Sequence, residues 1–374
     1  MKNIYRFAII LFLICSNIWS SGQAIEFSTD VFIAGENGYH SYRIPALAVT
    51  KKGTVLAFCE GRKLSRRDYG DIDLLLKRST DNGKTWSDQI VVWDDGSNTC
   101  GNPCPVVVSE TGRIVLLMTW GLGEDTEQMI IDGTSKDTRR VFITYSDDDG
   151  LSWSEPKEIT SDVKPKDWSW YATGPGGGIQ IEKGKFAGRL VVPCDHIETV
   201  TKNYFSHVII SDDNGNSWKL GGRTAEPMVN ECQVVELSGG KLMLNMRNYD
   251  KALKCRQTAI SYDGGLTWDE QKFDSVLIEP RCEASIKGFA WNKDGSRKLV
   301  LFSNPADSTR TKMTIRLSYD EAKSWEKSEV LHPGPSAYSD LVVFPGYKAG
   351  CLYEGGDNNA YEKIIFVGID LSKL

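Results

Sequence analysis

The stretch Ser79-Thr80-Asp81-Asn82-Gly83-Lys84-Thr85-Trp86 decides the fold, because its frame recurs along the chain. The shared pattern is S-x-D-x-G-x-[ST]-W, and the further copies begin at Ser146, Ser211, Ser261 and Ser318. In the copy at Ser318, Ala322 stands where the others have glycine. Five copies indicate an internal repeat, which is typical of an architecture built from similar units.

Each position of the repeat suits a tight turn between two strands. Serine and aspartate accept hydrogen bonds from N–H groups of the turn, and glycine supplies a positive φ. Tryptophan gives a large apolar surface to bury beneath the turn. Apolar or β-branched runs precede the copies, for example Val208-Ile209-Ile210. The repeat therefore predicts strand, turn, strand, and we interpret Asp81 as a turn residue on the outer edge of a scaffold.

The spacing of the repeat predicts the number of units. The copies lie roughly 60 residues apart, so about 350 residues hold about six units. We expect one all-β domain over residues 25–374, a six-bladed β-propeller of four-stranded antiparallel blades. Helical signals are weak: residues 124–131 form a loop or a short helix, and residues 162–167 at most a helical turn. In a propeller, loops from several blades converge on a central channel, so residues distant in sequence can share one site.

The N-terminus has the three parts of a secretory signal peptide. A short basic segment ending at Arg6 precedes the apolar run 7–14, and small residues follow at 20–24. We predict a signal peptide over residues 1–24, cleaved near Gly22 or Ala24, and a secreted or periplasmic protein with no membrane span. Lipid attachment at Cys15 is disfavoured, because Ile14 before it has the wrong size.

Charge and cysteine content exclude some functions. The net charge is −6, and removal of residues 1–24 makes it about −8, which argues against a nucleic-acid partner. Eight cysteines remain, with no C-x-x-C pair and four histidines in the whole chain, so we expect no metal site and no cofactor. We expect buried free thiols, and Cys100 and Cys104 are the pair left open for a disulfide.

Several polar residues stand beside predicted strands, where a plain scaffold would not need them. Taken singly, such an arginine is usually solvated, such an aspartate forms a turn and such a tyrosine packs. Their occurrence together and in order favours a shared chemical site. They are Arg43, Arg62, Asp68, Glu231, Arg247, Arg310, Tyr338 and Glu354.

The ordered set resembles the sialidase (neuraminidase) family over about residues 30–372. The shared features are a Y-R-I-P start, the repeated turns known as Asp boxes, an E-C-Q segment, an arginine after a strand, A-Y-S-D-L and L-Y-E-G-G. The resemblance implies six-bladed propellers that act as exo-glycosidases on terminal sialic acid. A sialylated glycan is then the expected partner; a monomer is favoured, and the oligomeric state stays open.

The resemblance also implies how the substrate is held. Arg43, Arg247 and Arg310 are similar to an arginine triad that clamps the carboxylate of sialic acid. Glu354 matches the acid that holds the first of these arginines in place. Arg62 resembles an additional arginine near the outer hydroxyls of the sugar.

The implied chemistry uses a tyrosine. Tyr338 resembles the nucleophile and Glu231 its base, because a neutral phenol avoids repulsion by the substrate carboxylate. Asp68 matches the general acid, and the net result would be retention of configuration. Asp71 and Asp73 lie close by in sequence. We prefer Asp68, because its loop can be mobile and reach the site, whereas residues 72–74 already form a predicted strand.

Alternatives remain at this stage. The tyrosyl intermediate could pass to another hydroxyl, giving a trans-sialidase or an anhydro product. A non-catalytic sialoside-binding propeller would be expected to lack Tyr338, Glu231 or Asp68, and all three are present. Further pocket residues are expected within 102–103, 118–120 and 170–176, where Met118 and Trp120 are more typical of packing.

Overall fold

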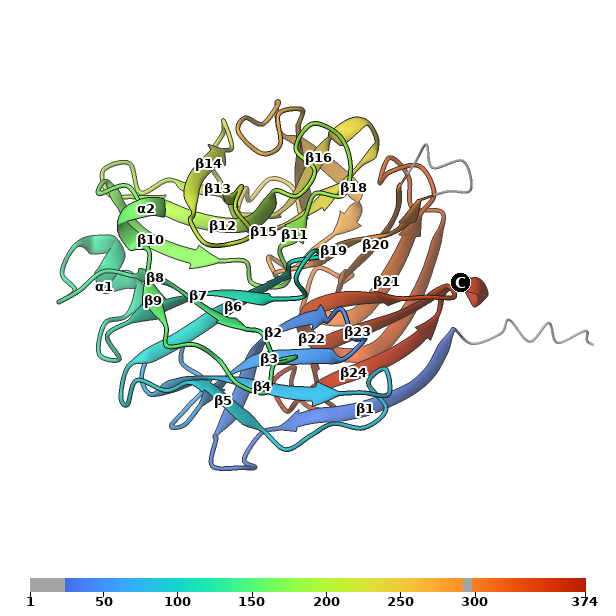
Figure 1. Ribbon diagram of the computed structural model, residues 1–374, viewed down its shortest axis with the longest axis horizontal. Coiled ribbons are helices and arrows are strands. Elements are labelled where there is room, and N and C mark those ends of the chain that lie inside the picture. The colour runs from blue at the N-terminus through green and yellow to red at the C-terminus, as the bar shows by residue number, and fades with distance from the viewer. Residues whose placement is uncertain (1–23, 292–297) are drawn as a thin grey trace, which may run out of the picture.

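The computed structural model describes residues 24–291 and 298–374, and strands make up most of its regular secondary structure (Figure 1). The all-β prediction is confirmed. Apart from Ala24, the predicted signal peptide lies outside the described residues. The helices are short: α1 (Glu127–Asp132), α2 (Thr160–Val163) and two 3₁₀ turns at Ser238–Gly240 and Leu371–Lys373. No helix in the described part is long and apolar enough to cross a membrane.

The strands between Ser41 and Arg223 pair in three groups whose neighbours are antiparallel, and one parallel residue pair, Ile72 with Thr99, joins the first group to the second. The first contains β2 (Ser41–Val49), β3 (Val55–Arg62), β4 (Ile72–Ser79) and β5 (Ile90–Trp93). The second contains β6 (Thr99–Val107), β7 (Ile114–Gly121), β8 (Arg140–Ser146) and β9 (Lys157–Glu158). The third contains β12 (Leu190–Glu198), β13 (Tyr204–Ser211) and β14 (Lys219–Arg223), with β10 (Trp168–Thr173) and β11 (Ile179–Gln180) both paired to β12.

Three further groups complete the described sheets. The fourth contains β15 (Val229–Glu236), β16 (Leu242–Asn248), β17 (Cys255–Ser261) and β18 (Lys272–Ile278). The fifth contains β19 (Ser285–Trp291), β20 (Lys298–Pro305), β21 (Thr311–Ser318) and the first half of β22 (Lys327–Phe344). The sixth contains the second half of β22, β23 (Lys348–Gly355), β24 (Lys363–Asp370) and β1 (Ile25–Ile33).

The groups are arranged around the middle of the molecule, and the N-terminal strand β1 lies beside β24 near the C-terminus (Figure 1). The strands nearest the middle are almost wholly buried along their length, as in β2, β6 and β15. These inner strands contact one another in sequence order, β6 with β12, β12 with β15, β15 with β19 and β19 with β22, and β2 contacts both β22 and β6. Consecutive inner strands can therefore bring residues from distant parts of the chain to one place.

The Asp boxes form the predicted turns. The box at Ser79 follows β4, and the other four follow β8, β13, β17 and β21. In the first, Asp81 accepts hydrogen bonds from Thr85 N (2.9 Å) and Thr85 Oγ1 (2.7 Å). Gly83 N donates to Ser79 Oγ (2.8 Å), and Trp86 Nε1 donates to Gly83 O (3.0 Å). Asp81 is thus a turn residue, as its place in the repeat predicts.

The fifth box, which begins at Ser318, forms the same turn although Ala322 replaces the glycine. Ala322 N donates to Ser318 Oγ (2.8 Å), and Asp320 accepts from Ser324 N (2.8 Å). Ala322 adopts φ of +61°, a backbone conformation that glycine adopts at lower cost. The hydrogen bonds of serine and aspartate therefore hold the turn without the glycine.

The cysteines lie within the sheets as free thiols. All eight cysteines of the described chain are buried and unpaired, including Cys100 and Cys104. The pair left open by the sequence therefore forms no disulfide. Burial raises the pKa of the Cys100 thiol above its usual range, which favours the unreactive neutral form.

Substitution of Gly83 tests whether the first Asp box requires a residue without a side chain at this position. A Cβ at Gly83 would lie 2.1 Å from a ring carbon of buried Phe366, whereas Gly53, with a similar positive φ, has nothing within 4 Å. We expect Gly53→Ala to lower the free energy of unfolding by about 1–2 kcal/mol through backbone strain alone. Gly83→Ala should cost about 1–3 kcal/mol more because of the clash. Denaturant unfolding of both variants measures the difference, and equal losses would contradict it.

Candidate active site

The predicted site residues meet in one pocket of about 320 Å³. They come from β2, β3, the β3–β4 loop, β15, β16, the loop before β21 and β22. The predicted residues that line the pocket are Arg43, Arg62, Asp68, Glu231, Arg247, Arg310 and Tyr338. Glu354 on β23 is fully buried and contacts the pocket through Arg43. The structure thus brings together all eight residues from six strands and two loops.

Glu354 fixes Arg43 with a two-point ion pair. Arg43 Nε donates to Glu354 Oε1 (2.9 Å) and Arg43 Nη2 donates to Oε2 (3.3 Å). The same carboxylate accepts the backbone N–H groups of Ile44 (2.9 Å) and Tyr338 (3.2 Å). Burial would lower the pKa of Arg43, but Glu354 and Asp68 keep it above the usual arginine value. Arg43 therefore stays charged, and its position is tied to the backbone of Tyr338.

Tyr338, Glu231 and Arg247 form a buried triangle. Tyr338 Oη donates to Glu231 Oε1 (2.6 Å), and Arg247 Nη1 donates to Glu231 Oε2 (2.6 Å) and to Tyr338 Oη (3.0 Å). Burial and Glu231 raise the pKa of Tyr338 above its usual range, although Arg247, Arg310 and Arg43 oppose them. The phenol is therefore neutral in the free site, and its proton already points at a carboxylate.

Arg310 carries a charge that no carboxylate of the described chain neutralises. Its Nη1 donates to Tyr361 Oη (2.7 Å) and its Nη2 to Arg281 O (3.3 Å). The guanidinium carbons of Arg43 and Arg310 lie 5.2 and 5.6 Å from the centre of the Tyr338 ring. Positive charge thus converges on the tyrosine, with room for an anion.

Asp68 stands at the mouth of the pocket. Its side chain is 67% exposed, and Oδ1 lies 2.7 Å from Arg62 Nη1 and 3.4 Å from Arg43 Nη1. Arg62 itself is almost fully buried and is held by Glu60 through its Nε and Nη2. Desolvation in the pocket would raise the pKa of Asp68, but the Arg62 and Arg43 charges outweigh it and lower the value.

The two neighbouring acids lie elsewhere. Asp73 is buried on β4, where it accepts from Tyr39 Oη (2.5 Å) and pairs with Lys63 (3.1 Å). Asp71 also pairs with Lys63 (3.0 Å). Neither lines the pocket, so of the three acids considered from sequence only Asp68 reaches it.

Further pocket residues were missed from the sequence. Arg139, just before β8, donates from Nη2 to Asn102 Oδ1 (3.0 Å), and its guanidinium lies over Trp170. Asp195 on β12 is buried and accepts both its hydrogen bonds from Asn230 Nδ2 (3.1 and 3.2 Å). Burial and the Glu231 charge raise the pKa of Asp195 well above its usual range. Asn230 precedes Glu231 in the chain, and this neighbour is the one local feature from which the group could have been found.

The expected lining segments are partly confirmed. Asn102 and Trp170 line the pocket, together with Glu127 from the first turn of α1. Met118 is buried in the core, and Trp120 donates from Nε1 to Asp95 (2.7 Å), so both serve packing as expected. Among the described residues no group of three or more metal-ligating side chains occurs.

With this geometry established, comparison with known proteins identifies the class of protein. Residues 53–350 match the family model of the BNR repeat-like domain. The chain is 34% identical over 353 residues to a sialidase of Micromonospora viridifaciens, covering 91% of this chain but only 54% of that protein. It is 30% identical over 368 residues to an exo-alpha-sialidase of Aspergillus fumigatus, covering 90% and 85%.

Solved structures agree. The Hadza microbial sialidase Hz136 superposes with a TM-score of 0.84 at 31% identity, over 93% of this chain and 69% of that one. The intramolecular trans-sialidase of Ruminococcus gnavus shares the fold with a TM-score of 0.76 at 20% identity, over 94% and 99%. The chain belongs to the sialidase family of glycosidases.

The Arg43–Glu354 pair generates a test of the buried charge. Removing Glu354 leaves Arg43 buried without its two-point partner, so Glu354→Ala should lower the free energy of unfolding by about 3–5 kcal/mol. Asp30→Ala is the control, because its pair with Lys363 (2.7 Å) is about one-third exposed and should cost less than about 1 kcal/mol. Both values come from denaturant unfolding. A similar loss in the two variants would show that Glu354 does not compensate a buried charge.

Proposed function

We propose that the protein is an exo-α-sialidase that hydrolyses terminal sialic acid from glycoproteins, glycolipids or oligosaccharides, with retention of configuration. The observation that carries the proposal is the convergence of Arg43, Arg247 and Arg310 on the hydrogen-bonded pair of Tyr338 and Glu231. This arrangement suits a substrate that carries a carboxylate at the reacting carbon. The arginines would bind the carboxylate of such a substrate, and Tyr338 with Glu231 would face its reacting carbon.

The substrate carboxylate is bound by the arginines. Arg310 offers the charge left without a carboxylate in the described chain, and Arg43 and Arg247 offer N–H groups next to Tyr338. Planar guanidinium groups bind a carboxylate through paired N–H donors, so three of them fix both its position and its orientation. The anomeric carbon then lies beside the phenol oxygen.

The first chemical step forms the bond between Tyr338 Oη and the anomeric carbon while the glycosidic bond breaks. Glu231 accepts the phenol proton along the existing 2.6 Å hydrogen bond. Asp68 donates a proton to the leaving oxygen. In the second step, Asp68 takes a proton from water, which displaces the tyrosine, and the proton returns from Glu231 to the phenolate. Two displacements at the same carbon give retention.

Substrate binding prepares Asp68 for its role. In the free site, Arg62 and Arg43 lower the pKa of Asp68, which favours the carboxylate over the acid. A substrate carboxylate on Arg43 neutralises part of this charge and raises the pKa of Asp68. The acid is thus protonated preferentially when a substrate is present.

We also propose that the six strand groups close into a six-bladed β-propeller. Its support is the sequence of contacts among the inner strands from β2 through β22 and back to β2. The antiparallel pairing of β1 with β24 would join the two ends of the ring. The pocket would then lie at one end of the central channel, where inner strands of all units converge.

Export is a further proposal. The segment 1–24 supports a signal peptide, and β1 begins at Ile25, with Asp370 N donating to Ala24 O (2.8 Å). Cleavage near Gly22 would keep Ala24 and this hydrogen bond, and cleavage after Ala24 would still leave β1 whole. The mature protein would be secreted or periplasmic.

The proposed function is tested with purified protein and an α-sialoside. We expect release of sialic acid by the unaltered protein, and Tyr338→Phe should lower kcat by about two orders of magnitude or more. Tyr347→Phe, at an exposed tyrosine outside the pocket, should leave kcat unchanged. NMR analysis of the product distinguishes hydrolysis from transfer or an anhydro sugar. Absence of any release between pH 4 and 8 would refute the proposal.

The role of Asp68 is tested by varying the leaving group. Asp68→Asn should lower kcat/KM on 3′-sialyllactose by about 10²–10⁴-fold, because its leaving alcohol needs a proton. A nitrophenyl sialoside, whose leaving group departs as an anion, should lose far less. Asp73→Asn is the matched control and should change both substrates by the same factor. Equal losses for Asp68→Asn on the two substrates would exclude it as the general acid.

A further inference from the structure

Three buried polar side chains, Asp340, Gln233 and Ser285, form a layer next to the Tyr338–Glu231 pair, two residues further along the strands. Asp340 follows Tyr338 by two residues on β22, and Gln233 follows Glu231 by two residues on β15, so each points to the same side of its strand as the residue above. Ser285 at the start of β19 completes the layer. All three are at most 1% exposed.

The layer joins three inner strands through short hydrogen bonds. Gln233 Nε2 donates to Asp340 Oδ1 (3.1 Å), and Ser285 Oγ lies 2.8 Å from Asp340 Oδ1 and 2.9 Å from Gln233 Oε1. Strands β15 and β22 are thus linked twice, once by Tyr338 with Glu231 and once by Asp340 with Gln233. The second link lies two residues further along each strand than the first.

Asp340 also accepts hydrogen bonds from backbone N–H groups in other parts of the chain. Its Oδ2 accepts the N–H groups of Leu47 on β2 (2.7 Å) and Gly177 before β11 (3.1 Å), and Oδ1 accepts Leu341 N (2.9 Å). With Gln233, four N–H donors satisfy one buried carboxylate, and the single hydroxyl proton of Ser285 can go to Asp340 or to Gln233. A carboxylate with this many donors cannot move without leaving several of them unpaired, which is costly in a buried place.

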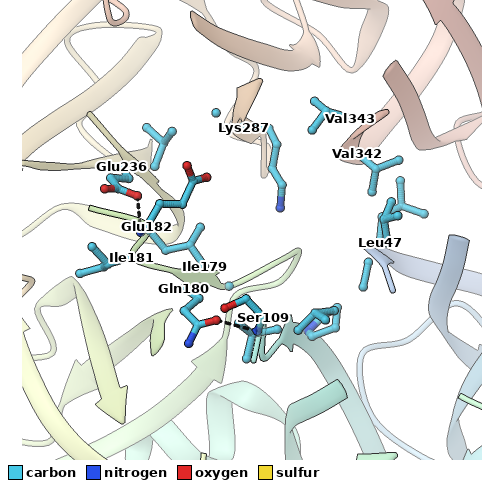
Figure 2. A pocket seen from close by; sticks show the side chains of 18 of the residues that line it. Leu47, Ser109, Ile179, Gln180, Ile181, Glu182, Glu236, Lys287, Val342 and Val343 are labelled. Atoms are coloured by element: carbon cyan, nitrogen blue, oxygen red, sulfur yellow. Dashed lines mark hydrogen bonds between the residues drawn. The ribbon is translucent and has the colours of Figure 1, made fainter. Parts of the chain in front are cut away.

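On the side of the layer away from Tyr338 and Glu231, the inner strands are separated by a cavity. Beyond it, the same inner strands surround a cavity of about 370 Å³, lined by Leu47, Lys287, Val342 and residues near them (Figure 2). Lys287 extends its amine into this cavity. Below the polar layer, residues of β15 and β22 line this cavity. Among the hydrogen bonds of the described residues, the two links between side chains of β15 and β22 are Tyr338 with Glu231 and Asp340 with Gln233.

We infer that Asp340, Gln233 and Ser285 act as positioning residues that hold Glu231 and Tyr338 at hydrogen-bonding distance for proton transfer. The inference rests on the proposed function of that pair. None of the three lines the pocket, so each acts through the residues above it. A shift of about 1 Å between β15 and β22 would cost up to about 100-fold in rate, because proton transfer and attack both depend on the reacting distance.

The test uses Gln233→Met, which keeps the size of the side chain and removes its link to Asp340. We expect kcat to fall about 10-fold or more with KM changed less than about twofold, because the arginine clamp is unaltered. Ser285→Ala, a milder change, should lower kcat by about threefold or more. Thr144→Val is the control: it removes a buried hydroxyl on β8 that donates to Ser154 O (2.6 Å), outside the layer. It should leave kcat unchanged.

A double-mutant cycle separates positioning from general loss of stability. In a Tyr338→Phe background no phenol proton remains to be transferred, so Gln233→Met should then change the residual rate by less than about twofold. A loss of the same size in both backgrounds would overturn the inference, as would a kcat unchanged by both Gln233→Met and Ser285→Ala. An inactive unaltered protein would instead refute the proposed function, so the two failures are distinguishable.

Discussion

The site depends on the concentration of positive charge in one pocket. Arg43, Arg62 and Arg247 are all largely buried, and a buried guanidinium is tolerated only with a carboxylate and well-formed hydrogen bonds. Each has such a partner, in Glu354, Glu60 and Glu231 respectively. Glu60 lies on the same strand as Arg62, but Glu354 and Glu231 come from other strands than Arg43 and Arg247, so these two pairs cannot form before those strands are in place. The free charge at Arg310 is the part of this arrangement that is left for a substrate.

In the proposed mechanism, the same charges explain why a tyrosine would serve as nucleophile. A carboxylate in the place of Tyr338 would pair with Arg247 or Arg310 and would repel the carboxylate of the substrate. A neutral phenol presents no charge in the ground state, and burial keeps its pKa high. When Glu231 takes the proton, the arginines stabilise the developing phenolate. Their contribution is therefore greater in the transition state than in the free site, which is what catalysis requires.

Local features of the fold were predictable, and distant ones were not. The Asp box is specified within eight residues, because Asp81 bonds to Thr85 and Ser79 to Gly83, and the sequence predicted these turns. Glu354 and Arg43 are 311 residues apart, and only the family resemblance linked them. Arg139 and Asp195 had no motif around them and were missed. The continuous strand β22, shared by two groups, also has no local signal, since its two halves belong to different pairings.

Strand β22 connects the architecture to the chemistry. Up to Pro335 it pairs with β21, and from Ser336 it pairs with β23, so its middle crosses from one group to the next. Tyr338 and Asp340 lie just after this crossing, where β22 also contacts β2 and β19. A residue at a crossing can be reached from several groups at once: Asp340 accepts N–H groups of Leu47 on β2, Gly177 before β11 and Gln233 on β15. The proposed nucleophile therefore occupies a place where the chain has many fixed neighbours, whereas the hydrogen bonds of the Asp boxes close turns.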